Sequence, residues 1–566
     1  MYIRNYHRRF NAVFLSFLIL FLFCCARLFF IQFFRSDYLA SLAKKQHNLF
    51  IELEPRRGTI FDANFHPLAF NVAVDSLYGS PNEIPDKDKP GLINKLSGIL
   101  KLDYTYLRDK LNRKKSFVWL ARKITPEQTQ AIRALKIKGI DFIKESKRSY
   151  PNGYLLSHIV GFAGLDNAGL DGIELNYDLY LKGEPGWALF LRDARQKKLD
   201  IWEKMILPKD GFDVVLTIDD VIQFIAEREL DKVYKATHAK GASIVVMDPH
   251  TGAILALANR PTFDLNEYRE APKESMRNRA IADMFEPGSV FKIVTASAVI
   301  EEGKVSEEQR FFCENGSYKI AGHVLHDHTS HGYLSFREVI EQSSNIGTCK
   351  IAQILGQDSL YQYVKKFGFG DKSGIDMPGE ISGSIKNPSF WSKTSITAIP
   401  MGQEVGVTAL QLTAAISVIA NGGNLMKPYV VKEIKDKMNV RIKAFSPVFV
   451  RKVMSLDTSF RVRKILIGAV EEGTGKLAKI PGVSIAGKTG TAQKIEPGGA
   501  YSHDKFVASF IGFTPAEDPL IAMAIIVDEP HPYYFGGVVS APVFKNTASD
   551  ILRYLKTKEP IISPQD

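Results

Sequence analysis

The longest run of apolar residues lies near the N-terminus. Residues 12–34 are apolar with three exceptions, and as a helix this segment would span about 34 Å, which is enough to cross a bilayer. Three arginines precede it in residues 1–11, so the positive-inside rule predicts a cytoplasmic tail there and export of the chain after residue 34. No small-x-small cleavage site ends the run, which favours an uncleaved transmembrane anchor over a signal peptide.

The hydrophobic pattern changes character near residue 211. Before it, strand-like and helix-like segments are mixed with many charges and carry no catalytic group of residues. After it, apolar runs at 242–247 and 253–258 flank Asp-Pro-His-Thr-Gly, which predicts a β-hairpin. Later segments predict three strands and a closing helix, at 483–486, 506–513, 521–527 and 543–555. We therefore expect one sheet built from both ends of this region, with a helix-rich insertion between them.

An apolar segment from Ser289 to Gly303 predicts a buried helix, because apolar residues cover nearly all of its sides. Lys292 is the single charged residue between 287 and 300, and Ser289 lies one helical turn before it, on the same face. A buried ammonium loses its proton easily. The neutral amine could then accept the hydroxyl proton of Ser289 and make this serine a nucleophile.

The Ser-x-x-Lys spacing alone proves little. The chain contains it twice more, at Ser41 with Lys44 and at Ser502 with Lys505. A helix N-cap serine followed by a lysine whose stem crosses an apolar surface gives the same pattern without catalysis. Partner motifs must therefore decide between the two interpretations.

A second motif, Ser343-Ser344-Asn345, follows a helix whose start is marked by a capping box at Ser335 and Glu338. It falls at the junction with the next helical run, where side chains are exposed. Ser343 could relay a proton to a leaving group, and the Asn345 amide could hold a substrate peptide group. The alternative is a cluster of helix caps without catalytic function.

A third motif, Gly-Lys-Thr-Gly-Thr around Lys488, suits an edge strand beside a ligand. Lys488 would add positive charge, and Gly490 would let a ligand backbone approach closely. The N–H of Thr491 could pair with that of Ser289 as an oxyanion hole. The hydroxyls of Thr489 and Thr491 could bind a substrate carboxylate.

Composition narrows the partners and the redox chemistry. The 566 residues are 45% hydrophobic and 24% charged, as in ordinary folded proteins. The net charge of +11 is spread along the chain, which fits an anionic membrane surface or cell-wall polymer, and no basic block with interleaved aromatic residues indicates nucleic-acid binding. Two of the four cysteines lie in the anchor, and a bridge between Cys313 and Cys349 remains open.

In this order, Ser-x-x-Lys at 289–292, Ser-x-Asn at 343–345 and Lys-Thr-Gly at 488–490 resemble the penicillin-binding and serine β-lactamase superfamily. With an anchor and a preceding non-catalytic domain, the chain is similar to a class B penicillin-binding protein. The resemblance includes three motifs before residue 211, Arg-Gly-x-Ile-x-Asp at 57–62, Arg-x-Tyr-Pro at 148–151 and Gly-x-x-Gly-x-Glu at 169–174. The chain departs from the family after Asp62, where it has Ala-Asn-Phe-His at 63–66.

The resemblance implies an α+β fold of the α/β type, with one N-terminal transmembrane helix. An elongated mixed pedestal domain of the dimerisation type would occupy residues 35–210. A penicillin-binding transpeptidase domain would follow at 211–566, with an antiparallel sheet flanked by helices and a helical subdomain. A glycosyltransferase domain does not fit before the pedestal, which argues against a bifunctional class A enzyme.

The implied activity is serine-type D-Ala-D-Ala transpeptidation. Ser289 would attack the penultimate D-alanine of a peptidoglycan stem peptide, and β-lactams would acylate the same serine. The resemblance implies no cofactor or metal. The run at 487–494 and the modest length are more similar to septal transpeptidases of cell division than to elongation-specific ones. Such proteins sit in the cytoplasmic (inner) membrane with the catalytic domain outside, and work with a membrane glycan polymerase and other divisome proteins.

Other functions remain as alternatives. The same motifs occur in D,D-carboxypeptidases and β-lactamases, which are hydrolases. A β-lactam-sensing receptor would need a cytoplasmic output module, which residues 1–11 are too short to form. A purely structural scaffold would not require Ser289, Lys292 and Lys488 together.

Four histidines cluster around Asp327, within nine residues of the sequence: His323, His326, His328 and His331. Their spacing is compatible with a metal site. However, one short loop rarely supplies all the ligands of such a site. We predict solvated histidines at the rim of a cleft, where an unperturbed imidazole titrates near neutral pH.

Overall fold

The structure is a computed structural model that describes residues 2–39, 48–115, 117–192, 198–320, 322–496 and 498–558. The chain forms two compact units, Met1–Arg56 with Gly183–Asp210, and Arg57–Lys182 with Gly211–Asp566. The predicted domain boundary between residues 210 and 211 stays a prediction. The Ser-x-x-Lys spacing at 41–44 lies outside the described residues.

The first unit contains the predicted N-terminal apolar helix. This helix, α1 (Tyr2–Phe34), carries a segment at Tyr6–Phe34 that is long and apolar enough to cross a membrane, and its apolar side chains are exposed. A three-stranded antiparallel sheet in the order β1-β6-β7 completes the unit. Its strands are β1 (Asn48–Leu53), β6 (Gly186–Arg192) and β7 (Lys198–Ile206).

The second unit contains a seven-stranded sheet whose strands come from distant parts of the chain. Its order is β19-β18-β8-β2-β3-β4, with β5 also paired to β3. The short strand β2 runs parallel to β8, and Ile60 lies opposite Val214. The strands are β2 (Ile60–Phe61), β3 (Pro67–Gly79), β4 (Val118–Ile124), β5 (Ile140–Ser149), β8 (Asp213–Leu216), β18 (Val431–Lys435) and β19 (Arg441–Ala444).

Short helices pack on this sheet. Leu77 of β3 and Leu120 of β4 form a small core with Leu96 of α3 and Leu107 of α4. The Thr125 side chain caps α5 in a reciprocal capping box with Gln128. The helices of this region are α3 (Lys89–Leu100), α4 (Tyr104–Leu111), α5 (Pro126–Ala134), α6 (Ser157–Val160), α7 (Gly172–Asn176) and α8 (Asp178–Leu181), with a 3-10 turn at Pro81–Glu83.

A buried ionic cluster of Arg57, Arg148, Glu174 and Asp178 joins the three motifs found before residue 211. Arg57 and Arg148 each donate a hydrogen bond of 2.6 Å from Nε to a different oxygen of Glu174. Arg57 also contacts Asp178 at 2.6 Å. Glu174 is 0% exposed and the two arginines at most 5%. The carboxylate of Glu174 therefore neutralises two guanidinium groups away from water, and it ties the entry to β2 to the end of β5 and to α7.

The second unit also contains a five-stranded sheet, in the order β10-β9-β23-β22-β21. The predicted hairpin is confirmed as the antiparallel pair β9–β10, and the predicted sheet from both ends of the region is confirmed because β9 pairs with β23. Its strands are β9 (Gly241–Met247), β10 (Ile254–Arg260), β21 (Ala486–Ile495), β22 (Tyr501–Thr514) and β23 (Ile521–Asp528).

Two boundaries predicted from the sequence are wrong. The strand predicted at 483–486 begins only at Ala486 and runs to Ile495, so it contains the Lys-Thr-Gly motif. Its pairing with β22 continues from Ala486 to Ile495, so the edge strand expected at the Lys-Thr-Gly motif and the strand expected just before it are one element. The closing helix α19 (Gly536–Lys558) starts before the predicted residue 543.

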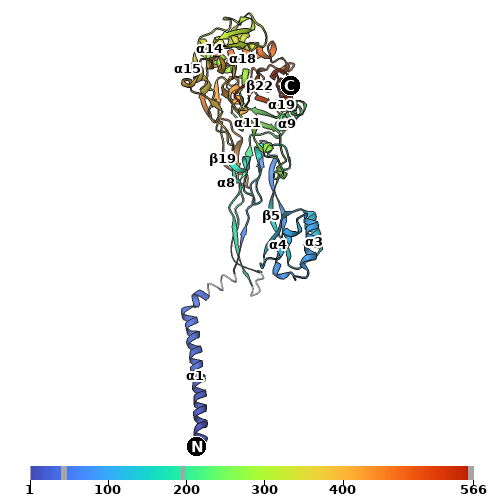
Figure 1. Cartoon of the computed structure of the whole chain (residues 1–566), viewed down its shortest axis with the longest axis vertical. Helices are drawn as coiled ribbons and strands as arrows, with labels where there is room; N and C mark the ends of the chain where they lie inside the picture. The colour runs from blue at the N-terminus through green and yellow to red at the C-terminus, as the bar shows by residue number, and fades with distance from the viewer. Residues whose placement is uncertain are drawn as a thin grey trace, which may run out of the picture. The chain divides into compact units, whose positions relative to one another are not determined.

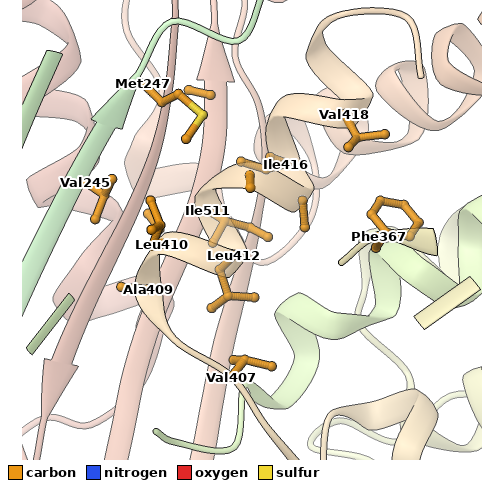
Figure 2. Packing of buried hydrophobic residues seen from close by; sticks show 14 of the residues in the cluster. Val245, Met247, Phe367, Val407, Ala409, Leu410, Leu412, Ile416, Val418 and Ile511 are labelled. Atoms are coloured by element: carbon orange, nitrogen blue, oxygen red, sulfur yellow. The ribbon is translucent and has the colours of Figure 1, made fainter. Parts of the chain in front are cut away.

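Helices cover both faces of the five-stranded sheet. Ile244 and Val246 of β9 belong to a core with α9 (Asp220–Ala236) and α19, which pack against each other (Figure 1). Val245 and Met247 point to the other face, toward Leu410 of the buried helix α17 (Ala409–Ala420) (Figure 2). This alternation is the period of two that a strand buried on both faces requires.

The helix-rich insertion between β10 and β21 is present as predicted. Capping boxes start α13 at Ser335 and α17 at Thr408, and α17 ends at Asn421. The larger helices are α12 (Lys292–Glu301), α13 (Phe336–Glu341), α14 (Asn345–Leu355), α15 (Gln357–Lys366) and α18 (Leu456–Glu471). The short helices are α10 (Lys273–Met276), α11 (Arg279–Ala282) and α16 (Ser395–Ala398), with 3-10 turns at Leu265–Glu267, Gly288–Phe291, Glu314–Gly316, Pro388–Phe390, Ile399–Met401 and Lys476–Ala478.

Small two-stranded sheets decorate the insertion, in the pairs β11–β14, β12–β13, β15–β16 and β17–β20. Their bounds are β11 (Arg310–Phe312), β12 (Ser317–Ile320), β13 (His323–His326), β14 (Tyr333–Ser335), β15 (Ser384–Ile385), β16 (Val405–Gly406), β17 (Asn424–Met426) and β20 (Phe449–Lys452). The mixed sheets and helices confirm the predicted α+β fold class.

The ionic cluster generates a stability prediction. We expect Glu174→Ala to lower the free energy of unfolding by about 3–5 kcal/mol, because two buried guanidinium groups lose their shared counterion. Calorimetric melting of the detergent-solubilised chain would measure the loss. Glu496→Ala is the control, since it removes an exposed pair with Lys505 that water screens, and it should change the stability far less than Glu174→Ala does. Equal losses in the two variants would contradict the assignment.

Candidate active site

The turn at residues 287–291 carries the candidate nucleophile Ser289, is called the nucleophile turn below, and is held by close backbone contacts. Gly288 has φ +60°, and a Cβ there would lie 2.8 Å from the carbonyl oxygen of Thr491. A Cβ on Gly402 would lie 2.3 Å from the carbonyl oxygen of Gly288. Glycine is therefore required at both positions, because a side chain would collide with backbone that cannot move independently.

This turn positions the serine and lysine of the first motif. It is a 3-10 turn from Gly288 to Phe291, and α12 follows from Lys292, so the predicted helix begins with a tighter first turn. Val290 and Phe291 are fully buried, whereas Ser289 is partly exposed and lines a cleft. The buried neighbours fix the turn and leave the Ser289 hydroxyl accessible.

Lys292 is fully buried and reaches the second motif. Its Nζ donates to the carbonyl oxygen of Ser343 at 2.6 Å, to the Ser343 hydroxyl at 3.2 Å and to Asn345 Oδ1 at 2.9 Å. Burial lowers the pKa of Lys292 to about 7, against a smaller raising effect from the charge of Asp327. Near neutral pH a large fraction of Lys292 is therefore the free amine, which has a lone pair to accept a proton.

Ser343 lies between two buried lysines. Lys488 Nζ donates to the Ser343 hydroxyl at 2.9 Å, and Lys488 is 0% exposed. Burial, together with the charge of Lys292, lowers the pKa of Lys488 well below its usual range. Ser343 adopts φ +62°, a left-handed conformation that is strained for a residue with a side chain. This backbone geometry lets one residue offer both its carbonyl and its hydroxyl to Lys292.

Asp327 is a site residue that the sequence reasoning assigned no role. Its Oδ1 accepts from the backbone N–H groups of Asn345 at 2.5 Å and Ile346 at 3.0 Å, and its Oδ2 accepts from the Ser344 hydroxyl at 2.6 Å. A carboxylate at the N-terminus of α14 is stabilised by unsatisfied N–H groups and by the helix dipole. In the sequence, Asp327 stands among four histidines and far from residues 344–346, so no local motif indicated that it contacts them.

The amide of Asn345 is oriented from both sides. Its Oδ1 accepts from Lys292, and its Nδ2 donates to the carbonyl oxygen of His326 at 2.9 Å. One N–H of the amide is left over by these two contacts. The side chain therefore has a fixed direction and one donor with which to meet a ligand.

The third motif lies on β21, an edge strand of the five-stranded sheet, as predicted. A Cβ on Gly490 would lie 2.9 Å from the carbonyl oxygen of Pro287 and 2.4 Å from the Ser509 hydroxyl. In the structure, Gly490 thus admits the nucleophile turn itself. The Thr491 hydroxyl accepts from the N–H of Gly536 at 3.1 Å. The close approach at Gly490 places β21 against the nucleophile turn, and the bond from Gly536 joins β21 to the start of α19.

The predicted site residues meet at one cleft with a volume of about 790 Å³. Ser289, Ser343, Asn345, Thr489, Gly490 and Thr491 all line it. Lys292 and Lys488 lie beneath this surface, fully buried. Within the described residues, no hydrogen bond joins the Ser289 hydroxyl to Lys292. The arrangement offers a partly exposed hydroxyl above a network of two amines and a second hydroxyl.

Histidine and aromatic side chains also line the cleft. His326, His328 and His331 line the cleft, and the ring of His328 packs edge-on against Phe535 at a centroid distance of 4.8 Å.

Cys313 and Cys349 are both buried and free, so the disulfide bridge that the sequence left open is not formed.

Comparison with known proteins gives two family matches. The model described as "Penicillin binding protein transpeptidase domain" matches residues 242–549, and the model described as "Penicillin-binding Protein dimerisation domain" matches residues 52–216. Together they cover most of the chain, in the order that the resemblance implied.

Named relatives extend over nearly the whole length. The chain is 37% identical to Stage V sporulation protein D of Bacillus subtilis over 97% of this chain and 86% of the relative. It is 30% identical to the peptidoglycan D,D-transpeptidase FtsI of Escherichia coli over 91% of this chain and 86% of the relative. The crystal structure of penicillin-binding protein 3 from Mycobacterium tuberculosis with aztreonam is similar at a TM-score of 0.70 and 29% identity, covering 89% and 97% of the two chains.

These matches confirm the family, the fold and the enzyme class expected from the three motifs. With α1, they also indicate a single-pass membrane protein. The chain belongs to the class B penicillin-binding proteins and is a peptidoglycan D,D-transpeptidase.

Proposed function

We propose that this transpeptidase cross-links peptidoglycan at the division septum, with Ser289 as nucleophile and Lys292 as its general base. The observation that carries the catalytic assignment is the buried amine of Lys292. It lies three residues after Ser289, and burial brings its pKa to about 7. A base that is partly neutral at the working pH can accept a proton and release it in the next step.

In the first step, Ser289 Oγ attacks the carbonyl carbon of the penultimate D-alanine while its proton passes to Lys292 Nζ. The N–H groups of Ser289 and Thr491 stabilise the oxygen that becomes negative. The C–N bond then breaks, and the Ser343 hydroxyl donates a proton to the departing amine of D-alanine. Ser343 suits this role because its oxygen accepts from Lys292 and Lys488, so that its proton is replaced from the amines behind it.

In the second step, the amine of a neighbouring stem peptide attacks the acyl ester and Ser289 recovers its proton. Before the first step, the hydroxyls of Thr489 and Thr491 bind the terminal carboxylate of the donor peptide, with Lys488 buried beneath them, and the free N–H of Asn345 contacts the peptide backbone. A β-lactam follows the first step alone, because its leaving group stays attached to the acyl group. The Mycobacterium tuberculosis relative is described in complex with aztreonam, a β-lactam, which supports this extension.

The septal role rests on the run at 487–494 and on the modest chain length. We propose that the three arginines before the apolar helix keep the N-terminus in the cytoplasm and place the cleft outside the cytoplasmic membrane. A membrane glycan polymerase and other divisome proteins would contact the helix around Arg27 and the region matched by the dimerisation model. A second candidate role is sporulation, favoured by the name of the Bacillus subtilis relative.

Covalent labelling tests the chemistry. We expect the full-length chain in detergent to retain a fluorescent penicillin on Ser289 for hours, and we expect Ser289→Ala and Lys292→Ala to remove the label. Ser502→Ala is the matched control, because Ser502 and Lys505 repeat the spacing outside the residues that line the cleft. Label that is released within minutes would indicate a hydrolase, and a wild type that never labels would refute the assignment of Ser289.

The pKa of Lys292 predicts the pH dependence of acylation. The base is neutral above its pKa of about 7 and protonated below it, so the acylation rate constant should rise about tenfold from pH 6 to pH 8 and then level off. Stopped-flow acylation by a chromogenic β-lactam measures this profile.

The matched variants separate the base from a general charge effect. Lys292→Arg keeps a protonated side chain across this range and should slow acylation by about 10²–10⁴-fold. Lys505→Arg should leave both the rate and the profile unchanged. A flat profile in the wild type would exclude Lys292 as the titrating base.

Depletion of the protein in its own host tests the septal role. Loss of septal cross-linking should produce filaments that grow without dividing, whereas loss of an elongation enzyme should produce rounded cells. Complementation with Ser289→Ala should fail to restore division. Normal division combined with defective spores would replace the septal role with the sporulation role.

A further inference from the structure

A second cluster of ligating side chains lies away from the cleft, where the β2–β3 turn meets the start of α9. Asp62 and His66 belong to the turn, and Asp220 is the first residue of α9. One potential metal-binding atom from each lies within 4.8 Å of the others. His66 Nδ1 is 3.1 Å from Asp220 Oδ2 and 3.4 Å from Asp62 Oδ2.

The two carboxylate oxygens of Asp62 are held to different degrees. Its side chain is 0% exposed, and its Oδ1 accepts from the backbone N–H groups of Asn64 at 2.8 Å and His66 at 2.7 Å. Its Oδ2 has longer contacts, with Asn64 Nδ2 at 3.2 Å and with the N–H of Asp220 at 3.3 Å. One oxygen thus anchors the carboxylate, and the other faces the cluster.

Asp220 has an oxygen that the described protein does not satisfy. Its Oδ1 is buried and has no hydrogen-bond partner among the described residues. Such an atom has lost its hydration without receiving a donor in exchange, which is costly for a carboxylate. The nearby ammonium group of Lys558 donates instead to Asp219 Oδ2 at 2.5 Å and to Asn64 Oδ1 at 2.8 Å. The Asp220 side chain as a whole is 23% exposed, and a cation bound there would give this buried oxygen a positively charged neighbour.

The spacing and the chemistry of the donors fit one kind of ion. In a tetrahedral zinc site with bonds of about 2.0 Å, neighbouring ligand atoms lie about 3.3 Å apart. The two distances from His66 bracket that value. Two carboxylate oxygens and one imidazole nitrogen suit Zn²⁺, and three protein ligands leave a fourth position for water or for Asp220 Oδ1.

We propose that Asp62, His66 and Asp220 bind one divalent transition-metal ion of the zinc type. The ion would join the β2–β3 turn to the N-terminus of α9, and so connect the region matched by the dimerisation model to the first helix that follows it. Its role is structural, because the site contains none of the residues that line the cleft. His66 belongs to residues 63–66, where this sequence differs from the pattern that the family usually shows after Asp62.

Zinc titration of the chelator-treated, full-length chain in detergent tests this site. Calorimetry should show one Zn²⁺ per chain, and His66→Gln or Asp220→Asn should weaken binding by at least about tenfold. His250→Gln is the matched control, since this exposed histidine lies in another turn and should leave zinc affinity unchanged. Labelling by fluorescent penicillin confirms that each variant is folded.

A variant in which His326, His328 and His331 are all replaced by glutamine separates this site from the cleft. It should still bind zinc as the wild type does. If zinc binding is lost there and retained in His66→Gln, the ion belongs to the cleft and the proposal is overturned. If the wild type binds no zinc, the three side chains form only an ion pair between an imidazolium and two carboxylates, and the proposal is likewise overturned.

Discussion

The exclusion of water from two lysine amines is the constraint on which the catalytic half of the structure depends. Lys292 and Lys488 are both 0% exposed and share the hydroxyl of Ser343. Charging both amines in this environment is unfavourable, so the network holds fewer protons than two lysines in water would. Such a network can accept one proton from a hydroxyl and return it to another. The apolar packing of α12 and the pairing of β21 both serve to keep these amines dry.

The position of Ser343 shows how local strain and helix capping support that network. Its left-handed backbone turns both its carbonyl and its hydroxyl toward Lys292. Asp327 and Ser344 hold the start of α14 directly behind it, because together they accept hydrogen bonds from three backbone N–H groups and Ser344 also donates to Asp327. The strain at one residue is thus maintained by good contacts at its neighbours, which is the usual arrangement at functional sites.

Much of this arrangement follows from local sequence pattern. The hairpin at 242–258, the buried helix after Ser289 and the capping box at Ser335 are all short-range features, and the structure contains each of them. The features that sequence reasoning missed depend on pairing between distant segments. A two-residue strand such as β2 has no periodicity to detect, and the length of β21 is set by its pairing with β22. Asp327 is of the same kind, since its partners lie 17–19 residues further along the chain.

The glycines around the nucleophile turn also limit how this enzyme can evolve. At Gly288, Gly402 and Gly490, any added side chain meets backbone oxygen within 2.9 Å. In the proposed mechanism a single serine, Ser289, reacts with both the stem peptide and a β-lactam, so a substitution that displaces this turn would impair both reactions. Heritable drug resistance has little room to arise in this turn. His328 and Phe535, which also line the cleft, meet through their rings alone, so a change there removes a side-chain contact and leaves the backbone of the nucleophile turn in place.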